Sequence, residues 1–413
     1  MNVKWQMSYP FLCPKKLDHY SKEKFMNLLN LKICRLAFLL LGINASSCSQ
    51  IRTANYLASA STNASNCSQS DVQSAIDRAA SGDTVSLPSC SAATWSSKVS
   101  IPGSKGITLD GKGSTITGAV DVTQNDRTST RITNFNFTSP KSVYFHGTPS
   151  SATARLDHSK ISGGDSSILV EVEGNAPVLI DHNVFTGGGA SEMIHNYGTW
   201  DDSGWKDDVT PGGPTMVFIE DNTFNNTGAS GNPAYFWGTS AVQSYYSART
   251  VFRHNTLNMA QVDQHGTPGM VGARWWEIYE NTFNIIENGN QSSYMSIRAG
   301  SGVIFNNHKA GAQNQGAGTI ELLEEDSGYP ALYQIGRGKN QSPDPAYVWG
   351  NDPSMRVVSN SSNVQENRDF YLSAKPNYRP YPYPHPMAAE TSRLNWPIKS
   401  IPPINLKPLI EPK

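Results

Sequence analysis

Apolar residues return at fixed places in a short phrase that recurs along this 413-residue chain. From residue 130 onward the phrase reads RITNFNF, RLDHSKI, LIDHNVF, FIEDNTF, VFRHNTL and EIYENTF. Successive phrases are offset by 24, 24, 39, 33 and 26 residues, measured between their last apolar residues: Phe137, Ile161, Phe185, Phe224, Leu257 and Phe283. A repeat of this length indicates stacked structural units. We therefore predict one repetitive domain and not several separate ones.

Two positions inside the phrase keep one kind of residue. Five residues before each end stands another apolar residue, and the series runs on past the last phrase: Ile132, Leu156, Ile180, Ile219, Phe252, Ile278 and Ile304. Two residues before the end, the later units carry asparagine: Asn183, Asn222, Asn255, Asn281 and Asn307. Amides stacked about 4.8 Å apart can hydrogen-bond to one another and to the turn backbone. The pattern predicts coils with an apolar interior and an asparagine ladder at one turn.

The segment before the repeats predicts one helix, one strand and one disulfide. In DVQSAIDRAASGDTVSLPSC, four apolar residues have helical spacing and Gly82-Asp83 follows as a stop: Val72, Ala75, Ile76 and Ala79. All five cysteines lie in the first 90 residues, and only Cys67 and Cys90 are certain to remain once a leader is removed. Two remaining cysteines in an exported protein favour a disulfide between them.

An apolar run near residue 40 predicts export. From Leu31 the chain reads LKICRLAFLLLGINASSC, with basic residues before the apolar run and small residues after it. This is typical of a secretion signal and too short for a transmembrane span. We assign residues 1–48 to a leader, with Met26 as a candidate natural start, and residues 49–65 to a linker. Cys48 is a candidate lipid-attachment site, with simple cleavage nearby as the alternative. The expected location is secreted, periplasmic or on the outer surface.

The amino-acid composition limits the classes of molecule that the protein is expected to bind. Charged residues make up 16% of the chain, against about 25% in an average globular protein, while 34 glycines and 25 prolines favour turns and strands. With 33 basic and 34 acidic side chains the net charge is −1, so no overall field attracts nucleic acid or an anionic membrane. We expect a monomer that binds no nucleic acid and has no transmembrane span.

The helical cap, the segment GITLDGKGSTITG and the coils with I-x-x-N-x-F turns resemble the right-handed parallel β-helix of the pectate-lyase-like superfamily. LIDHNVF and IRAGSGVIFNN are similar to strand and turn segments of its extracellular bacterial members. The resemblance covers residues 66–345 and implies an all-β solenoid with an N-terminal helical cap.

Residues 365–413 hold ten of the 25 prolines, which cannot join a strand ladder. Residues 346–413 are therefore expected to form an extended tail that packs along the helix or caps its open end.

Insertions and aromatic residues indicate where a ligand binds. The intervals longer than 24 residues follow Phe185, Phe224 and Leu257, so we expect three consecutive coils to carry loops at corresponding places. In the superfamily such loops line a groove that holds a polysaccharide, and the resemblance implies such a groove here. Aromatic rings stack on sugar rings, and packing of the loops onto the helix is the equal alternative. The candidate substrate-binding residues are Trp200, Trp205, Trp237, Tyr245 and Trp275. Trp276 aligns with core positions, so Trp275 is expected to point outward.

For an acidic polysaccharide, the resemblance favours cleavage by β-elimination. A cation must neutralise the uronate carboxylate, a base must remove the adjacent proton, and an acid or water must protonate the leaving oxygen. Arginine, lysine, histidine and tyrosine are the residues that β-helix lyases share in these roles. Arg274 and Arg298 lie 24 residues apart, one short coil, so we expect them to stand above one another. A surface salt bridge for each arginine is the alternative.

Four further residues complete the predicted catalytic set. His265 is the expected base, with Asp263 as its orienting partner or a metal ligand, Tyr294 as a candidate acid and His195 closing the site from the first long loop. Three other histidines share a column beside the asparagine ladder and are assigned to turn structure: His158, His182 and His254.

The chain departs from true pectate lyases in two respects. It lacks their paired-arginine segment and a clear aspartate set for calcium, which argues against pectate as the substrate. Ca²⁺ is still the one cofactor considered, and a solvated acidic loop is the alternative for its four weak candidate ligands: Asp201, Asp202, Asp207 and Asp208.

Two other functions stay open. A polygalacturonase-like hydrolase is one, because Asp201-Asp202, Gln264-His265-Gly266 and Ile297-Arg298 loosely follow the order of motifs in those enzymes. It needs two carboxylates that face each other across a groove. The other is a non-catalytic solenoid that binds glycans or has a structural role at the cell surface. It needs the aromatic residues but not the set Arg274, His265 and Arg298.

Overall fold

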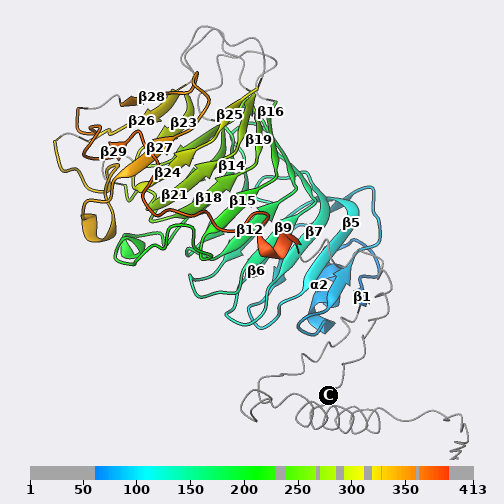
Figure 1. Ribbon diagram of the computed structural model, residues 1–413. Coiled ribbons are helices and arrows are strands. Elements are labelled where there is room, and N and C mark those ends of the chain that lie inside the picture. The colour runs from blue at the N-terminus through cyan, green and yellow to red at the C-terminus, as the bar shows by residue number, and fades with distance from the viewer. Residues whose placement is uncertain are drawn as a thin grey trace, which may run out of the picture. The chain divides into compact units, whose positions relative to one another are not determined.

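Parallel strands stacked in three columns form the body of the molecule (Figure 1). The computed structural model describes residues 61–227, 239–266, 270–284, 293–310, 319–326, 328–359 and 362–389. The chain divides into two units, Met1–Ala58 and Ser59–Lys413, and all described residues belong to the second. Sheet A has 19 strands and sheet B has 10 within these residues, and their strands pair in parallel. The fold is a right-handed parallel β-helix, which confirms the predicted fold class.

Each column contributes one strand to a coil. The first column, in sheet A, precedes the asparagine turn: β1 (Ser61–Asn63), β2 (Thr84–Ser86), β5 (Thr108–Thr117), β7 (Arg131–Phe137), β9 (Ala154–Asp157), β12 (Val178–Asp181), β15 (Val217–Glu220), β18 (Arg249–Arg253), β21 (Trp275–Tyr279), β24 (Ser301–Phe305), β27 (Ala346–Trp349) and β29 (Phe370–Tyr371). The second column, also in sheet A, follows that turn: β3 (Ala93–Thr94), β10 (Lys160–Ser162), β13 (Val184–Gly187), β16 (Thr223–Asn226), β19 (Thr256–Asn258), β22 (Thr282–Asn284) and β25 (His308–Lys309). Strands β5 and β7 are long enough to pair in both columns.

The third column is sheet B: β4 (Val99–Ile101), β6 (Val120–Thr123), β8 (Val143–His146), β11 (Ile168–Glu173), β14 (Glu192–Tyr197), β17 (Ser240–Ser244), β20 (Gln261–Gln264), β23 (Ser293–Ile297), β26 (Thr319–Leu322) and β28 (Arg356–Ser359). The described residues also contain the helix α2 (Gln69–Arg78), the short 3₁₀ helices η2 (Ser203–Trp205) and η5 (Lys339–Gln341), and helical residues at 386–389.

The predicted apolar column lies in the interior. Ile180 pairs with Ile219, and Ile219 pairs with Phe252, so the same position of each coil stacks on the next. All seven residues of the column are fully buried in one hydrophobic core: Ile132, Leu156, Ile180, Ile219, Phe252, Ile278 and Ile304. The prediction from the repeat is confirmed.

The asparagine ladder forms as predicted and extends to Asn351. The backbone N–H of Asn183 donates to Asn222 Oδ1 at 2.9 Å, and its Nδ2 donates to the same oxygen at 3.1 Å. The same side-chain bond repeats from each asparagine to the next along the series, and in the last one Asn307 Nδ2 donates to Asn351 Oδ1 at 2.8 Å. The residue before the asparagine has a left-handed backbone, with φ of 56° at His182. This ladder satisfies buried turn groups that would otherwise be unpaired.

The three histidines assigned to turn structure occupy this left-handed position. Their φ angles are 50° at His158, 56° at His182 and 54° at His254. The rings of His158 and His182 stack with centroids 5.2 Å apart, and His254 stacks on Tyr383. Their place in the turns confirms the assignment.

The N-terminal cap contains the predicted helix and disulfide. Val72, Ala75 and Ile76 are the buried face of α2, and the Ser68 hydroxyl accepts a hydrogen bond from the Asp71 N–H at its start. Cys67 and Cys90 are joined by a disulfide, as expected.

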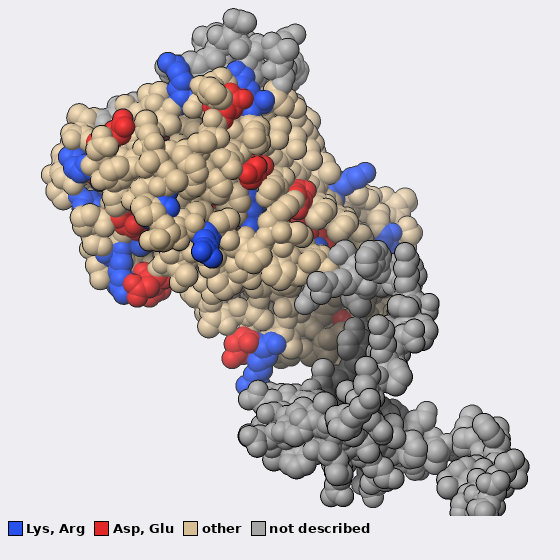
Figure 2. Space-filling view, viewed as in Figure 1, with Lys and Arg blue, Asp and Glu red and all other residues tan. Residues whose placement is uncertain are grey.

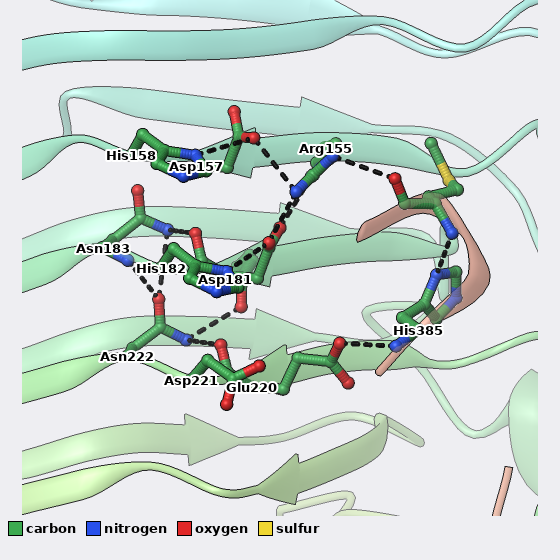
Figure 3. Close-up of polar contacts among 12 residues, drawn as sticks. Arg155, Asp157, His158, Asp181, His182, Asn183, Glu220, Asp221, Asn222 and His385 are labelled. Carbon is green, nitrogen blue, oxygen red and sulfur yellow. Dashed lines mark hydrogen bonds and ion pairs between the residues drawn. The ribbon is translucent and has the colours of Figure 1, made fainter. Parts of the chain in front are cut away.

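Coil pairing continues beyond residue 345, where the tail was expected to begin. Strand β27 pairs with β24, and β28 pairs with β26. The segment after β29 then runs back over the outer face of the first column (Figures 1 and 3), where Arg253 Nη1 donates to the Tyr381 carbonyl at 2.6 Å and Arg155 Nη1 to the Met387 carbonyl at 3.0 Å. We call residues 372–389 the C-terminal strap.

The strap covers a second apolar cluster on the outside of the first column. Tyr378, Tyr381 and Met387 of the strap pack against side chains that point away from the helix interior. The buried members are Leu179, Met216, Phe218, Val251, Trp275, Tyr279, Val303 and Phe305. Strands β12, β15, β18, β21 and β24 therefore carry buried apolar side chains on both faces.

The three long insertions do not all leave from corresponding places, contrary to the expectation. Residues 198–216 connect β14 to β15, and residues 265–274 connect β20 to β21, so both link the third column to the first. Residues 227–239 instead connect β16 to β17, from the second column to the third. Only the first and third insertions therefore share one edge of the helix.

The described surface matches the low charge content. On the face in Figure 2, lysine, arginine and acidic side chains lie in small mixed groups among uncharged residues. Within the described residues, no helix has the length and apolar character needed to cross a membrane.

Candidate functional site

Polar and aromatic side chains gather on the outer face of the third column between β14 and β23. Strand register places His195 beside Gln243 and Gln243 beside Asp263. A second row lies two residues further along each strand, because the backbone N–H of His265 bonds to β17 and that of Arg298 bonds to β20. We call these residues the sheet B cluster: Glu192, His195, Tyr197, Gln243, Tyr245, Asp263, His265 and Arg298.

Asp263 is the centre of one half of the cluster. Gln243 Nε2 donates to Asp263 Oδ2 at 2.9 Å, and Arg298 donates to both carboxylate oxygens, with Nε 3.4 Å from Oδ1. Arg298 Nη2 also contacts His265 Nδ1, which lies 3.5 Å from the carboxylate. Burial opposes ionisation of Asp263, but hydrogen bonding from His265 and the charge of Arg298 outweigh it and lower its pKa. Asp263 is thus an ionised group that holds His265 and Arg298 together.

His195 is the centre of the other half. Its Nδ1 is 2.7 Å from the Tyr197 hydroxyl oxygen, and its Nε2 contacts the Glu192 carboxyl group. Burial lowers the pKa of His195 to about 3, and the positive charge of Lys141 acts in the same direction. Burial and the negative charge of Asp263 raise the pKa of Glu192 to about 7. At neutral pH the imidazole is therefore uncharged and Glu192 is close to its titration midpoint.

Aromatic rings join the two halves. Tyr245 has its ring 4.4 Å from the ring of His265 and 5.6 Å from that of His195. Tyr197 stacks on Trp200 with centroids 4.1 Å apart, and Trp200 remains 48% exposed. Burial raises the pKa of Tyr197 to about 12, so its hydroxyl is protonated at neutral pH. The cluster thus combines a neutral imidazole, protonated tyrosines, an arginine and an exposed aromatic face.

Arg274 does not stand above Arg298, so that expectation is wrong. Trp275 pairs with Ser301, which puts Arg274 beside Gly300, whereas Arg298 has His265 as its neighbour in the preceding coil. The Arg274 guanidinium lies over the Trp205 ring at 5.3 Å, and its Nη1 is 3.6 Å from Asp344. Arg274 is buried at the start of a first-column strand and contacts a different set of residues.

Three other candidates are buried in packing positions. Tyr294 lies in the central core with its ring 5.4 Å from that of Phe283, so it does not reach the outer face. Trp205 is 2% exposed and donates to the Gly272 carbonyl at 3.1 Å. Trp275 points outward as predicted, but it is 1% exposed in the cluster beneath the strap, whereas Trp276 lies in the core. Neither Trp205 nor Trp275 offers a free face to a sugar.

The remaining predicted residues fall into two groups. Trp237 lies outside the described residues. The four loop aspartates have separate partners: Asp201 accepts from Ser203 N, Asp202 pairs with Lys206 at 3.0 Å, Asp207 lies 3.5 Å from Arg249, and Asp208 pairs with Lys339 at 2.8 Å. Among the described residues, no three histidine, cysteine, aspartate or glutamate side chains gather in a way that could hold a metal ion.

Glu192, Tyr197 and Gln243 were not predicted from the sequence. A signal for Tyr197 and Gln243 exists in the aligned strand segments EMIHNY, SAVQSY, QVDQH and SYMSIR, where polar residues recur at two positions separated by one residue, whereas Glu192 lies outside both positions. These two positions form the two rows on the outer face.

Neither family models nor curated proteins give a match to this chain. Among solved structures, it is similar to one titled as the crystal structure of alginate lyase from Paenibacillus sp. str. FPU-7, with 15% sequence identity. The alignment covers 78% of this chain and 97% of the other, with a TM-score of 0.28. At these values, the function has to be argued from the chain's own residues.

Proposed function

We propose that the sheet B cluster is the active site of an exported enzyme that cleaves a uronate-containing glycan by β-elimination. The observation that carries the proposal is the contact between His265 and Arg298, both bound to ionised Asp263, next to protonated tyrosines. β-Elimination needs a cation, a base and a proton donor within the length of one sugar, and this set contains all three.

Each residue has a separate role. Arg298 neutralises the uronate carboxylate, which acidifies the neighbouring C5 proton. His265 removes that proton, and Asp263 holds both side chains in place. A tyrosine hydroxyl, from Tyr197 or Tyr245, protonates the leaving oxygen in place of the buried Tyr294. The exposed face of Trp200 beside Tyr197 stacks on a neighbouring sugar ring.

A glycoside hydrolase is the second candidate, because one observation favours it. Burial and the charge of Asp263 raise the pKa of Glu192, while His265 and Arg298 outweigh burial and lower the pKa of Asp263. Two carboxyl groups whose pKa values diverge are the usual acid and base of glycoside hydrolysis. In that case Glu192 would protonate the leaving oxygen and Asp263 would act as base or nucleophile.

The deciding experiment is ultraviolet absorbance during incubation with pectate, alginate, glucuronan and glycosaminoglycans, each with and without Ca²⁺. Elimination leaves a conjugated unsaturated uronate, and hydrolysis does not. We expect absorbance to rise with at least one glycan and to stay flat for His265→Ala. His308→Ala, a histidine exposed at the end of the second column, is the matched control and should retain activity. New reducing ends without absorbance would establish the hydrolase. The absence of both signals would favour a binding solenoid.

A further inference from the structure

Glu192, His195 and Tyr197 form a continuous hydrogen-bonded chain that ends at the outer face of sheet B. We propose that this chain is a proton relay, in which Tyr197 gives its proton to the leaving glycosidic oxygen and is reprotonated by Glu192 through His195. Tyr197 is then the catalytic acid, and Glu192 and His195 are positioning residues behind it. The proposal rests on the glycan-cleaving function proposed above and names its proton donor.

A local irregularity in β14 creates the chain. Met193 and Ile194 both lie in the central core, so the usual alternation of inward and outward side chains slips by one residue. Glu192 and His195 therefore both reach the outer face although they are three residues apart, and Tyr197 follows in normal alternation. Without the slip, Glu192 and His195 would lie on opposite faces and could not bond.

The protonation states set the direction of transfer. A neutral imidazole carries one proton, so one ring nitrogen donates and the other accepts. When Glu192 is protonated, it donates to Nε2, and Nδ1–H donates to the Tyr197 oxygen. The hydroxyl proton of Tyr197 then faces outward toward the substrate. The low pKa of His195 and the raised pKa of Glu192 both favour this arrangement below about pH 7.

The proton and electron balance closes in one concerted step. His265 takes the C5 proton, and the electron pair of that C–H bond forms the C4–C5 double bond as the C4–O bond breaks. The leaving oxygen takes the Tyr197 proton, Nδ1 passes its proton to Tyr197, and Glu192 passes its own to Nε2. The step ends with Glu192 as a carboxylate, His265 as an imidazolium and His195 still neutral but in the other tautomer. Solvent then returns one proton to Glu192 and removes one from His265, which resets the site.

Several charged and titratable groups face the hydrogen-bonded series Glu192, His195 and Tyr197 and influence the pKa values of its members. The carboxylate of Asp263 raises the pKa of Glu192, and Arg298 opposes that effect. The neighbouring groups are Lys141 before β8, Glu171 and Glu173 on β11, Tyr245 and Tyr246 after β17, Asp263 on β20, His265 after β20, and Arg298 after β23.

The tautomer of His195 tests the relay without any substrate. In the full chain with ¹⁵N-labelled histidines, NMR should show His195 protonated on Nδ1 at low pH and on Nε2 after Glu192 ionises near pH 7, with His195→Gln used to assign the signals. In Glu192→Gln the amide still donates to Nε2, so we expect Nδ1–H at every pH. Glu171→Gln, which faces His195 from β11, should keep the switch. A fixed tautomer in the wild type, or a switch that persists in Glu192→Gln, would overturn the relay.

Kinetics separates failure of the relay from failure of the proposed function. The kcat of the wild type should fall above about pH 7, where Glu192 loses its proton. Glu192→Gln should lower kcat by about 10²-fold, keep KM within twofold and remove this fall. An active enzyme without these changes overturns the relay alone. A tautomer switch without cleavage of any glycan overturns the proposed function and, with it, the catalytic role of the chain.

Discussion

Two outer faces of this β-helix carry rows of charged side chains. We call the row on the first column the closed row, because the strap covers it, and the row on the third column the open row, because it stays accessible to solvent. On the outer face of the first column, Arg155 donates to Asp181 at 2.8 and 2.7 Å, and Arg253 donates to Glu220 at 2.7 Å. The strap completes this row, because its backbone carbonyls accept hydrogen bonds from both arginines and the His385 N–H donates to Glu220. Figure 3 shows the contacts of Arg155 and Glu220. On the outer face of the third column, Glu192 keeps 29% of its side chain exposed.

The difference separates structural charges from functional ones. In the first column Arg155 and Arg253 each have a carboxylate and a strap carbonyl, so these two charges are compensated where they are buried. In the third column His195 and Glu192 are held far from their ordinary pKa values, and Glu192 stays open to solvent. Perturbed groups at an open surface are typical of a site that handles protons. We therefore expect mutations in the two rows to affect different properties.

The largest effect should come from the core that both rows share. Ile219→Asp puts a charge in the fully buried apolar column and should abolish cooperative unfolding, because the cost of several kcal/mol is a large part of a domain's stability of about 5–15 kcal/mol. Circular dichroism against temperature measures it. Ile219→Val is the control, with an expected loss of about 0.5–1.5 kcal/mol. A normal melting curve for Ile219→Asp would show that the repeat alignment is wrong.

Arg155→Ala should destabilise the closed row without changing the chemistry. It leaves Asp181 as a buried charge without its main partner, which costs about 3–5 kcal/mol. Urea unfolding gives the loss, and kcat at a temperature where the variant is folded should stay within twofold. Arg131→Ala is the matched control, because Arg131 is 27% exposed and its partner Asp157 keeps a contact with Arg155. Equal losses for the two variants would contradict this account of the first column.

In the open row, His265→Ala should change the chemistry without destabilising the fold. We expect kcat to fall by about 10²- to 10⁴-fold, as for loss of a general base, with little change in melting temperature. Turnover on the responsive glycan and a thermal melt of the same sample measure both. Retained activity would remove His265 from the site.

Arg274→Ala tests whether Arg274 belongs to the structural residues or to the catalytic ones. Because the guanidinium is buried against Trp205 and Asp344, its loss should cost about 1–3 kcal/mol of stability and leave kcat within a few-fold. The same melt and turnover assays apply. A large loss of kcat with an unchanged melt would return Arg274 to the catalytic set.

The smallest expected effect is the pH dependence of stability, and it has opposite signs in the two rows. Hydrogen bonding from His182 and pairing with Arg155 outweigh burial and lower the pKa of Asp181, so its contribution is present above about pH 4 and lost as pH falls further. The raised pKa of Glu192 means that the folded state holds a proton which the unfolded state releases, so stability falls from about pH 4.3 to about pH 7.

Urea midpoints between about pH 3 and pH 8 measure both slopes. Glu192→Gln should flatten only the decline toward neutral pH, and Asp181→Asn should flatten only the acid limb. If either substitution changed the opposite limb, the assignment of these groups would be wrong.

The sequence predicted the stacking well because each coil repeats the same residue type at the same place. The apolar column and the asparagine ladder depend only on local spacing around one tight turn, and both formed as predicted. Of the six predicted catalytic residues, Asp263, His265 and Arg298 lie in contact with one another.

The errors have two physical origins. The 24-residue spacing of Arg274 and Arg298 predicts stacking only if the coil has 24 residues, but the coil from Trp275 to Ser301 has 26, so the two arginines belong to different columns. Tyr294 was judged on residue type alone, yet Tyr294 and Met295 both point into the core. Strand β23 thus has the same kind of slip in alternation as β14, and this type of irregularity accounts for one false candidate and one missed residue.

The asparagine ladder also bears on how such a protein can change over time. Its rungs are separated by 39, 33, 26, 26 and 44 residues along the chain, yet each rung makes the same bond to the next. The ladder therefore keeps the strands in register whatever the length of the segment between two rungs. Loops beside the third column can be lengthened, shortened or exchanged between coils without moving the residues that stack, which leaves ligand preference free to diverge on an unchanged frame.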